Sequence, residues 1–143
     1  MDVFAGQYGN SKLTLLFKST DNGENWRYVT DIYPSFWPKL FVHRGALYLL
    51  SVSQDYGDLL IGRSLDEGET WTAPTHIITG CGPFEMGPHK APMPVIEHNG
   101  RLYTGIDYGC WRHHRHANGL LSIDVDTDPL NAADWRFTPF TQF

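Results

Sequence analysis

Aromatic and ionisable side chains concentrate in five short stretches of the 143-residue chain: QYGNS, DIYPSFWPK, QDYGD, GCGPFEMGPHK and DYGCWRHHRHANG. The rings of Trp37, Tyr56 and Trp111 offer flat faces that match the apolar side of a sugar ring. Charged groups in the same stretches can bind hydroxyls or a carboxylate; they are Lys39, Asp55, Glu85, Lys90, Asp107 and Arg112. Together these residue types indicate a site for a polar, ring-shaped ligand.

The run CWRHHRHANG indicates a second chemistry, because Cys110, His113, His114 and His116 are ligand types for zinc or copper. His89, on another of the five stretches, would complete such a site. Adjacent histidines on an extended segment point in opposite directions, however, so one short run rarely supplies three ligands. The alternative is a solvated loop in which His89 or His113 hydrogen-bonds a ligand hydroxyl. We therefore expect no metal and no other cofactor.

The elements that must position these residues are short strands. Segments such as KLTLLFKS, ALYLLSVS, DLLIGRS and RLYTGIDY are rich in β-branched or aromatic residues and are bounded by Gly, Asn, Asp or Pro. No segment keeps a helical apolar spacing over three turns. The stretches HRGA and HNGR are typical of tight hairpins. The sequence thus predicts an all-β fold.

A repeat organises these strands. The octet STDNGENW at residues 19–26 returns as SLDEGETW at residues 64–71, a spacing typical of four-stranded propeller blades. Labelling strands A to D outward from the propeller axis, we expect a partial β-propeller of three antiparallel blades within one domain, 1–143. The blades would span 1–32, 38–79 and 90–143, and the first would lack its inner strand.

The repeated octet has the composition of a turn between the third and fourth strands of a blade. Its aspartates can accept backbone amides, its glycines allow left-handed φ, and its tryptophans can bury a ring beneath the turn. We expect a structural role, with direct ligand binding as the alternative. The residues concerned are Ser19, Asp21, Gly23 and Trp26, and Ser64, Asp66, Gly68 and Trp71.

This octet, SxDxGxxW, resembles the Asp-box, or BNR repeat, of sialidase (neuraminidase-type) β-propellers. The wider stretches HRGALYLLSVSQDYGDLLIGRSLDEGETWTAP and KAPMPVIEHNGRLY are similar to bacterial propellers of the predicted exo-sialidase group. The resemblance covers nearly the whole chain. It implies six blades, Asp-boxes on one side and a glycan-binding face on the other, where the five stretches would meet.

The resemblance also bears on catalysis. Sialidases hold a carboxylate with three arginines and use a Tyr nucleophile, a Glu and an Asp acid/base. The family's Arg-Ile-Pro motif is missing here, and Arg112 and Arg115 remain as anion binders. Asp107 or Glu85 as acid/base, with Tyr108 as nucleophile, are the candidates. A sialidase-like glycoside hydrolase, a non-catalytic carbohydrate-binding or protein-interaction module and a fragment of a longer hydrolase all stay open.

Bulk properties narrow the partners. A net charge of −5 argues against nucleic acid, and no apolar run approaches the roughly 18 residues of a membrane span. MDVFAGQYGN does not look like a signal peptide, although removal of a leader from a secreted or periplasmic parent would leave the same picture. Cys81 and Cys110 flank the same predicted blade and would form a disulfide in an oxidising compartment, or remain thiols.

Three blades do not close a propeller, and an open stack exposes apolar faces at both ends. A homodimer would supply six blades and close the ring. The alternatives are a fragment of a longer propeller and an open stack with adapted ends.

Overall fold

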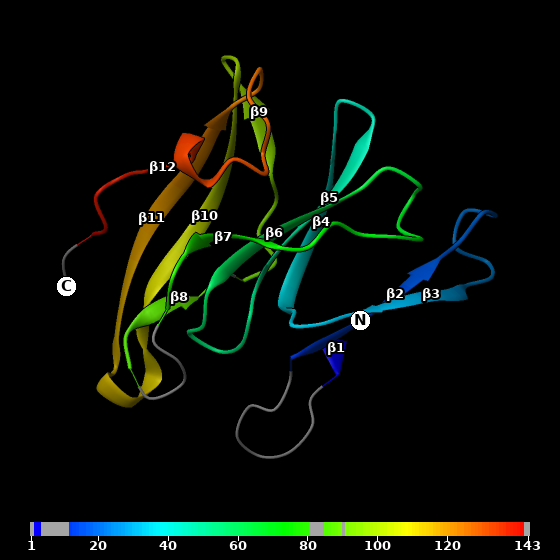
Figure 1. Cartoon of the computed structure of the whole chain (residues 1–143). Helices are drawn as coiled ribbons and strands as arrows, with labels where there is room; N and C mark the ends of the chain where they lie inside the picture. Colours follow the sequence, from blue (N-terminus) through cyan, green and yellow to red (C-terminus); the bar gives the residue numbers. More distant parts are fainter. Residues whose placement is uncertain (1, 4–11, 81–84, 90, 142–143) are drawn as a thin grey trace.

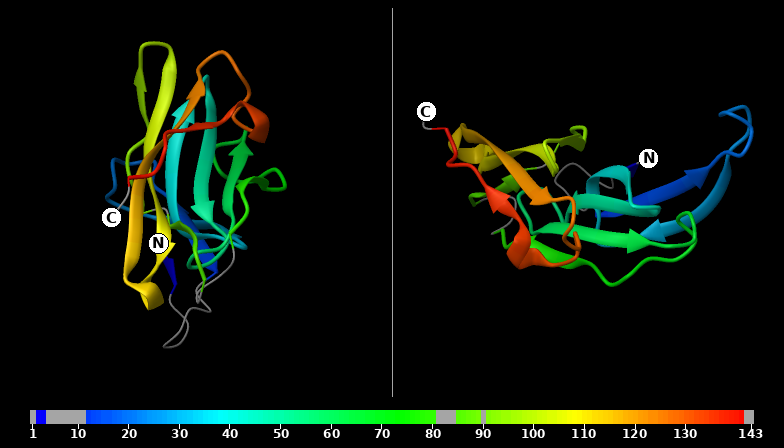
Figure 2. Two further views of the ribbon diagram at one scale, coloured as in Figure 1. Left: turned by 90° about the vertical axis from the view of Figure 1, so that its left-hand side faces the viewer. Right: turned by 90° about the horizontal axis from the view of Figure 1, so that it is seen from above.

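A computed structural model of the chain describes residues 2–3, 12–80, 85–89 and 91–141 and shows three antiparallel sheets (Figure 1). Sheet 1 has the order β1-β2-β3, from β1 (Asp2–Val3), β2 (Leu13–Lys18) and β3 (Arg27–Ile32). Sheet 2 has the order β4-β5-β6-β7, from β4 (Phe36–His43), β5 (Ala46–Val52), β6 (Leu59–Ser64) and β7 (Thr75–Ile78). The sheets follow one another in chain order (Figure 2).

Sheet 3 has the order β12-β11-β10-β8, and β9 also pairs with β10. Its strands are β8 (Gly87–His89), β9 (Ile96–His98), β10 (Arg101–Cys110), β11 (Arg115–Asp124) and β12 (Arg136–Phe137). Two 3₁₀ turns, η1 (Trp111–His113) and η2 (Ala132–Asp134), are the helical elements of the described residues. No helix in that part of the chain is long and apolar enough to cross a membrane.

This arrangement confirms the predicted all-β fold, a partial β-propeller whose first sheet lacks the innermost strand. The third sheet differs in one respect, because its expected inner strand is divided into β8 and β9. Pro92 and Pro94 lie between the two pieces. Proline has no amide hydrogen to donate to the β10 ladder, so the pairing stops and resumes beyond it.

The main core lies between sheets 2 and 3. Leu50, Leu59 and Ile61 from sheet 2 are fully buried against Leu121 and Ile123 from sheet 3. Burying a side chain of this size contributes about 1.5–3 kcal/mol relative to its exposed state. This packing holds the two sheets in a fixed relation, so loops at their shared end can form a site.

The two octets fold into the same turn. Ser19 Oγ donates to Asp21 Oδ1 at 2.7 Å and accepts from the Gly23 amide at 2.8 Å. Asp21 Oδ1 also accepts from the amide of Asn25, and Trp26 Nε1 donates to the Gly23 carbonyl at 2.9 Å. The second octet repeats each bond, with Ser64, Asp66, Gly68, Thr70 and Trp71 in the equivalent places.

These bonds act on the two aspartates in the same way. Hydrogen bonds from the backbone and side chain of Asn25, and from Ser19, lower the pKa of Asp21 to about 2. Bonds from the side chain and backbone of Thr70, and from Ser64, lower the pKa of Asp66 to about 2. A carboxylate that accepts several hydrogen bonds is stabilised in its charged form.

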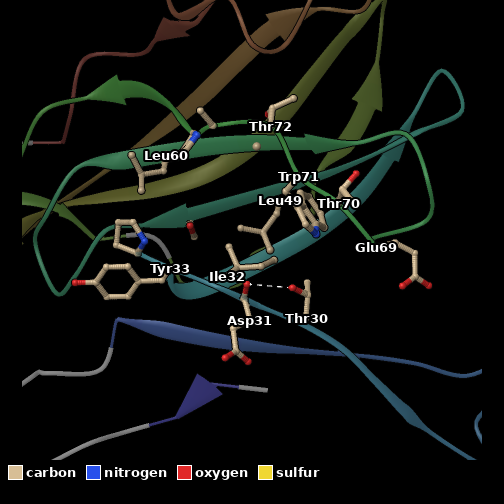
Figure 3. A pocket seen from close by; sticks show the side chains of 15 residues that line it. Thr30, Asp31, Ile32, Tyr33, Leu49, Leu60, Glu69, Thr70, Trp71 and Thr72 are labelled. Atoms are coloured by element: carbon tan, nitrogen blue, oxygen red, sulfur yellow. Dashed lines mark hydrogen bonds between the residues drawn. The ribbon is translucent and has the colours of Figure 1, made fainter.

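The expectation that both octet tryptophans are buried is wrong for Trp26, whose side chain is 63% exposed. Trp71 lies between sheets 1 and 2, beside Leu49 and Gly62 (Figure 3). The equivalent flank of sheet 1 is an end of the stack, and no described sheet lies against it. Trp71 is itself only half-buried, so the same turn shields its indole in part, and only where a neighbouring sheet covers it.

Candidate functional site

A loop of sheet 2 and the inner strand of sheet 3 meet closely at one end of the core. A side chain on Gly87 would place its Cβ 2.1 Å from the Tyr56 carbonyl oxygen, so only glycine fits there. The short strand β8 can then lie against the 53–58 loop, which connects β5 to β6. The octet turn follows β6 and therefore lies at the opposite end of the sheet.

Tyr56 joins three segments at this junction. Its side chain is fully buried, and its ring stacks on His89 of β8 at 5.2 Å between centroids. The phenol oxygen lies 2.9 Å from His116 Nε2 and accepts a hydrogen bond from the Trp111 amide at 3.1 Å. The 53–58 loop is itself closed by a bond from the Ser53 amide to the Asp58 carbonyl. One side chain thus fixes the loop to β8 and to the β10–β11 connection.

Aromatic rings surround the imidazole of His89. The centroid of Trp37, from β4, lies 5.0 Å away, and that of Trp111 lies 6.0 Å away with a nearly perpendicular ring. Trp111 also makes an edge contact with His116 at 4.5 Å. We refer to the whole group as the His89 cluster: Trp37, Asp55, Tyr56, His89, Asp107, Trp111 and His116.

Two carboxylates approach opposite nitrogens of the same imidazole. Asp55 Oδ1 lies 3.7 Å from His89 Nε2, and Asp107 Oδ2 lies 3.8 Å from His89 Nδ1. Both separations are too long for a direct hydrogen bond but short enough for electrostatic attraction or a bridging hydroxyl. His89 is 6% exposed, and its buried Nδ1 has no hydrogen-bond partner among the described residues. A buried polar atom without a partner is unusual in a folded protein and marks this imidazole for attention.

Burial is the largest influence on the pKa values of His89, Asp55 and Tyr56. It lowers the pKa of His89, although Asp55 and Asp107 act in the opposite direction. Burial also raises the pKa of Asp55, against the influence of His89 and His116. The pKa of Tyr56 is raised by burial first and by Asp55 second, so its phenol stays protonated at neutral pH. A neutral imidazole donates from one nitrogen and accepts at the other.

A pocket of about 220 Å³ opens beside His89 and Asp107. Gly105 leaves part of its wall without a side chain, and Asn118 pairs with Asp107 in the β10–β11 ladder. This volume lies below the range of about 300–1,000 Å³ that drug-sized ligands occupy, and it suits a single ring with polar substituents.

Six of the side chains that the sequence places in a binding or catalytic role come together in the His89 cluster: Trp37, Asp55, Tyr56, His89, Asp107 and Trp111. Arg112 and His113 are exposed on η1, directly after Trp111. Lys90 lies outside the described residues. Only Asp55 and Tyr56 of this group lie in a loop between strands, whereas Trp37, His89 and Asp107 lie in β4, β8 and β10.

Three other predicted residues lie apart from the cluster. Tyr108 packs against Phe140 at 5.5 Å, because it follows Asp107 on a strand and points to the opposite face. Glu85 is exposed before β8, and Lys39 is half-buried on β4. No contact described for Glu85 or Lys39 reaches the cluster.

His116 is the member of the cluster that the sequence pointed to only as a metal ligand. Its alternation with Arg115 on β11 turns it inward, toward Tyr56. The described residues contain no group of three or more His, Cys, Asp or Glu side chains that could hold a metal ion. Cys110 is buried at the end of β10, whereas Cys81 lies outside the described residues, so the possible disulfide stays a prediction.

Comparison with solved structures adds a likeness in fold. No protein-family model matches the chain, and no curated protein matches it significantly. The fold is similar to that of an α-L-arabinanase from Penicillium chrysogenum, solved in complex with arabinobiose, with a TM-score of 0.58 and 16% identity. The match covers 88% of this chain and 40% of that chain. At this identity the likeness shows the propeller fold.

Proposed function

We propose that this chain is a sialidase-like propeller module that binds glycans at the His89 cluster. The observation that carries the proposal is the convergence of three aromatic rings and two carboxylates on one buried imidazole. The repeated octet turn, with its matching hydrogen bonds, supports the sialidase-type resemblance. The structural likeness to an arabinanase solved with arabinobiose supports a sugar as ligand.

The cluster has the chemistry that a sugar ring requires. Trp111 is 60% exposed and offers an aromatic face to the apolar side of the ring. The carboxylates of Asp55 and Asp107 accept hydrogen bonds from hydroxyls, and neutral His89 can donate or accept. Arg112, next to Trp111, supplies a positive charge for a carboxylate or sulfate on the same ligand.

Glycoside hydrolysis is the second candidate function. Burial raises the pKa of Asp55, which favours the protonated form that a general acid needs, while Asp107 lies on the pocket wall. The two carboxylates face opposite nitrogens of His89 rather than each other. This placement suits the wider spacing of an inverting pair better than the separation of about 5–5.5 Å in retaining enzymes.

We also propose that two chains close a six-bladed ring, in which sheets 1, 2 and 3 each act as one blade. The second and third blades then begin slightly before the expected 38 and 90, at Phe36 of β4 and Gly87 of β8. Both ends of the stack carry exposed apolar side chains, Phe17, Trp26 and Tyr28 on sheet 1 and Met93, Ile96 and Leu120 on sheet 3. Exposed apolar patches on soluble proteins commonly mark interfaces. The alternatives to this dimer are that the chain is a fragment of a longer propeller or that it stays an open stack of three blades.

A glycan array probed with the purified chain tests the proposal, and a panel of fluorogenic glycosides separates binding from hydrolysis. Trp111→Ala should weaken binding of the best glycan by about tenfold, because packing of a sugar ring on an aromatic face contributes about 1 kcal/mol or more. Leu65→Ala is the matched control, since Leu65 is 78% exposed at the octet-turn end of sheet 2. Equal binding by both variants would move the ligand away from the cluster.

A further inference from the structure

A second pocket, of about 330 Å³, lies between sheets 1 and 2, away from the His89 cluster (Figure 3). One wall comes from the end of β3 and the following turn, with Thr30, Asp31, Ile32 and Tyr33. The other wall comes from β5, β6 and the segment 69–74 that precedes β7. Its volume falls within the range of about 300–1,000 Å³ that is usual for small-ligand sites.

The pocket exists because the two octets continue differently. In sheet 1, β3 begins at Arg27, directly after Trp26. In sheet 2, β7 begins only at Thr75, after Thr72, Ala73 and Pro74. Thr72 still pairs with Arg63, but Pro74 has no amide hydrogen for the ladder. The segment therefore leaves the edge of β6 before β7 begins, and residues 69–74 line the pocket.

Gly62 forms part of the floor without a backbone reason for being glycine. It lies inside β6, and it is not among the glycines with positive φ. A Cβ at this position would meet Trp71 at 3.6 Å, which is ordinary van der Waals contact. A glycine within a strand commonly marks a place where a ligand or another backbone approaches closely. Here the Trp71 ring and the Thr72 carbonyl oxygen lie beside Gly62, and all three residues line the pocket.

The lining combines an apolar floor with a polar rim. Ile32, Leu49, Leu60 and Trp71 form the floor, and the ring of Tyr33 stands at one end with 69% of its surface exposed (Figure 3). The rim carries threonine hydroxyls, which donate and accept, and the carboxylates of Asp31 and Glu69. A ligand that fits must present an apolar face and several hydroxyls.

The charges of the rim restrict the ligand further. Asp31 and Glu69 are both acidic, and no lysine or arginine is among the described residues that line the pocket. Tyr28 donates to Asp31 at 2.7 Å, and Arg27 pairs with Glu69, so neither acid stands as an isolated charge that calls for a cation. The Tyr28 hydroxyl does not neutralise Asp31, so this carboxylate would repel an acidic sugar, whereas a neutral sugar would find acceptors for its hydroxyls.

We infer that the pocket between sheets 1 and 2 is a second carbohydrate site, which takes one or two neutral sugar residues. This site is separate from the one in the proposed function, because it shares no residue with the His89 cluster and would bind neutral sugars only. Neutral residues of a glycan chain would bind here, against Tyr33 and the floor above Gly62.

The indole Nε1–H signal of Trp71, assigned with a Trp71→Phe variant, reports on this pocket in ¹H–¹⁵N spectra of the full chain. Arabinobiose or cellobiose should shift it with a Kd of order 1 mM. Digalacturonate, the acidic probe, should bind about tenfold more weakly because of the charge on Asp31. Choline is the cationic probe. If choline shifts the signal as strongly as the neutral sugars, or if neither neutral sugar shifts it, the inference is overturned.

Two variants make the test independent of global folding. Gly62→Leu should fill the pocket and remove the sugar-induced shift. Tyr33→Ala changes an exposed ring and should weaken the neutral sugars by about tenfold while the circular dichroism spectrum stays unchanged. Phe137→Ala, in sheet 3, is the matched aromatic control and should bind as the unmodified chain does. Binding retained in Tyr33→Ala would overturn the assignment, while loss of array binding in Trp111→Ala concerns only the His89 cluster.

Discussion

Trp26 and Trp71 close the same hydrogen-bonded turn 45 residues apart, yet Trp26 is 63% exposed while Trp71 lies between two sheets. In each turn the indole nitrogen donates to the glycine carbonyl three residues earlier. The difference is therefore not in the turn but in what lies beside it. Sheet 1 covers Trp71, and the equivalent position beside Trp26 would be filled by another blade.

This difference predicts that the stability of Trp71→Ala and that of Trp26→Ala depend differently on protein concentration. Trp71→Ala should lower the free energy of unfolding by about 2–3 kcal/mol at any concentration, somewhat less than a fully buried tryptophan loses. Trp26→Ala should act mainly through association, because a partner that covers the folded face stabilises by mass action. Urea unfolding and light scattering across a dilution series measure both. If the chain has a monomeric mass at micromolar concentration and still binds glycan, the six-bladed ring formed by two chains is excluded.

The loss of folding stability at acidic pH should depend on Asp21 and Asp66, the two octet aspartates. Each has a folded pKa of about 2, below the ordinary value of 3.8. Their stabilisation is therefore fully present above about pH 4 and is lost as pH falls toward 2. Asp66→Asn should lower stability at neutral pH and flatten its decrease across this window.

Urea unfolding at several pH values between 4 and about 2 tests the octet prediction. Leu65→Ala is the control, since it changes an exposed, uncharged side chain in the same turn. A decrease as steep in Asp66→Asn as in the unmodified chain would mean that the hydrogen bonds to this carboxylate do not stabilise the fold.

The sequence predicted the sheets because their signals are local. The period of the octets, the hairpins HRGA and HNGR, and alternating apolar residues all depend on neighbours in the chain. Exposure of Trp26 could not be read in this way, because it depends on a sheet that either does or does not lie beside sheet 1. The same local turn has two environments, and only the three-dimensional arrangement distinguishes them.

The candidate site was predicted in composition but not in geometry. The sequence analysis grouped the stretches that contain Asp55, Tyr56 and His89. The stacking of Tyr56 on His89, however, depends on the absence of a side chain at Gly87. The inward turn of His116 depends on the register of β11 with β10, which pairs it with Gly109. Neither contact leaves a periodic signal in the sequence, so neither was expected.

Tyr56→Phe should loosen the junction between sheets 2 and 3. The phenol oxygen bonds His116 and the Trp111 amide, and its loss leaves both groups without that partner. A buried polar group left unsatisfied costs about 1–3 kcal/mol. Urea unfolding measures the loss, and hydrogen exchange of the Trp111 amide should become faster. Unchanged exchange would show that the hydroxyl does not fix η1.

Arg112→Ala should separate acidic from neutral glycans. Arg112 is exposed beside Trp111, where a guanidinium can pair with a carboxylate or sulfate on a ligand held by the cluster. The variant should weaken an anionic glycan by about tenfold, which corresponds to one charge-assisted bond, and leave a neutral glycan nearly unchanged. Calorimetric titration with a matched acidic and neutral pair gives the comparison. Equal weakening of both would place Arg112 outside the contact.

His89 should make the stability of the protein depend on pH just below neutrality. Its folded pKa lies below the ordinary value of 6.5 because the ring is buried, so the unfolded chain binds the proton more tightly. Stability is then fully present above about pH 6.5 and falls as pH drops toward the folded pKa, by at most about 1.4 kcal/mol per pH unit. Asp55 and Asp107 face the same ring and oppose this shift, whereas His116 adds to it. His89→Gln should remove this slope, whereas His76→Gln, which changes an exposed histidine on β7, should retain it. Urea unfolding between about pH 5.5 and 7.5 measures the slopes, and a slope that persists in His89→Gln would assign the titration to another group.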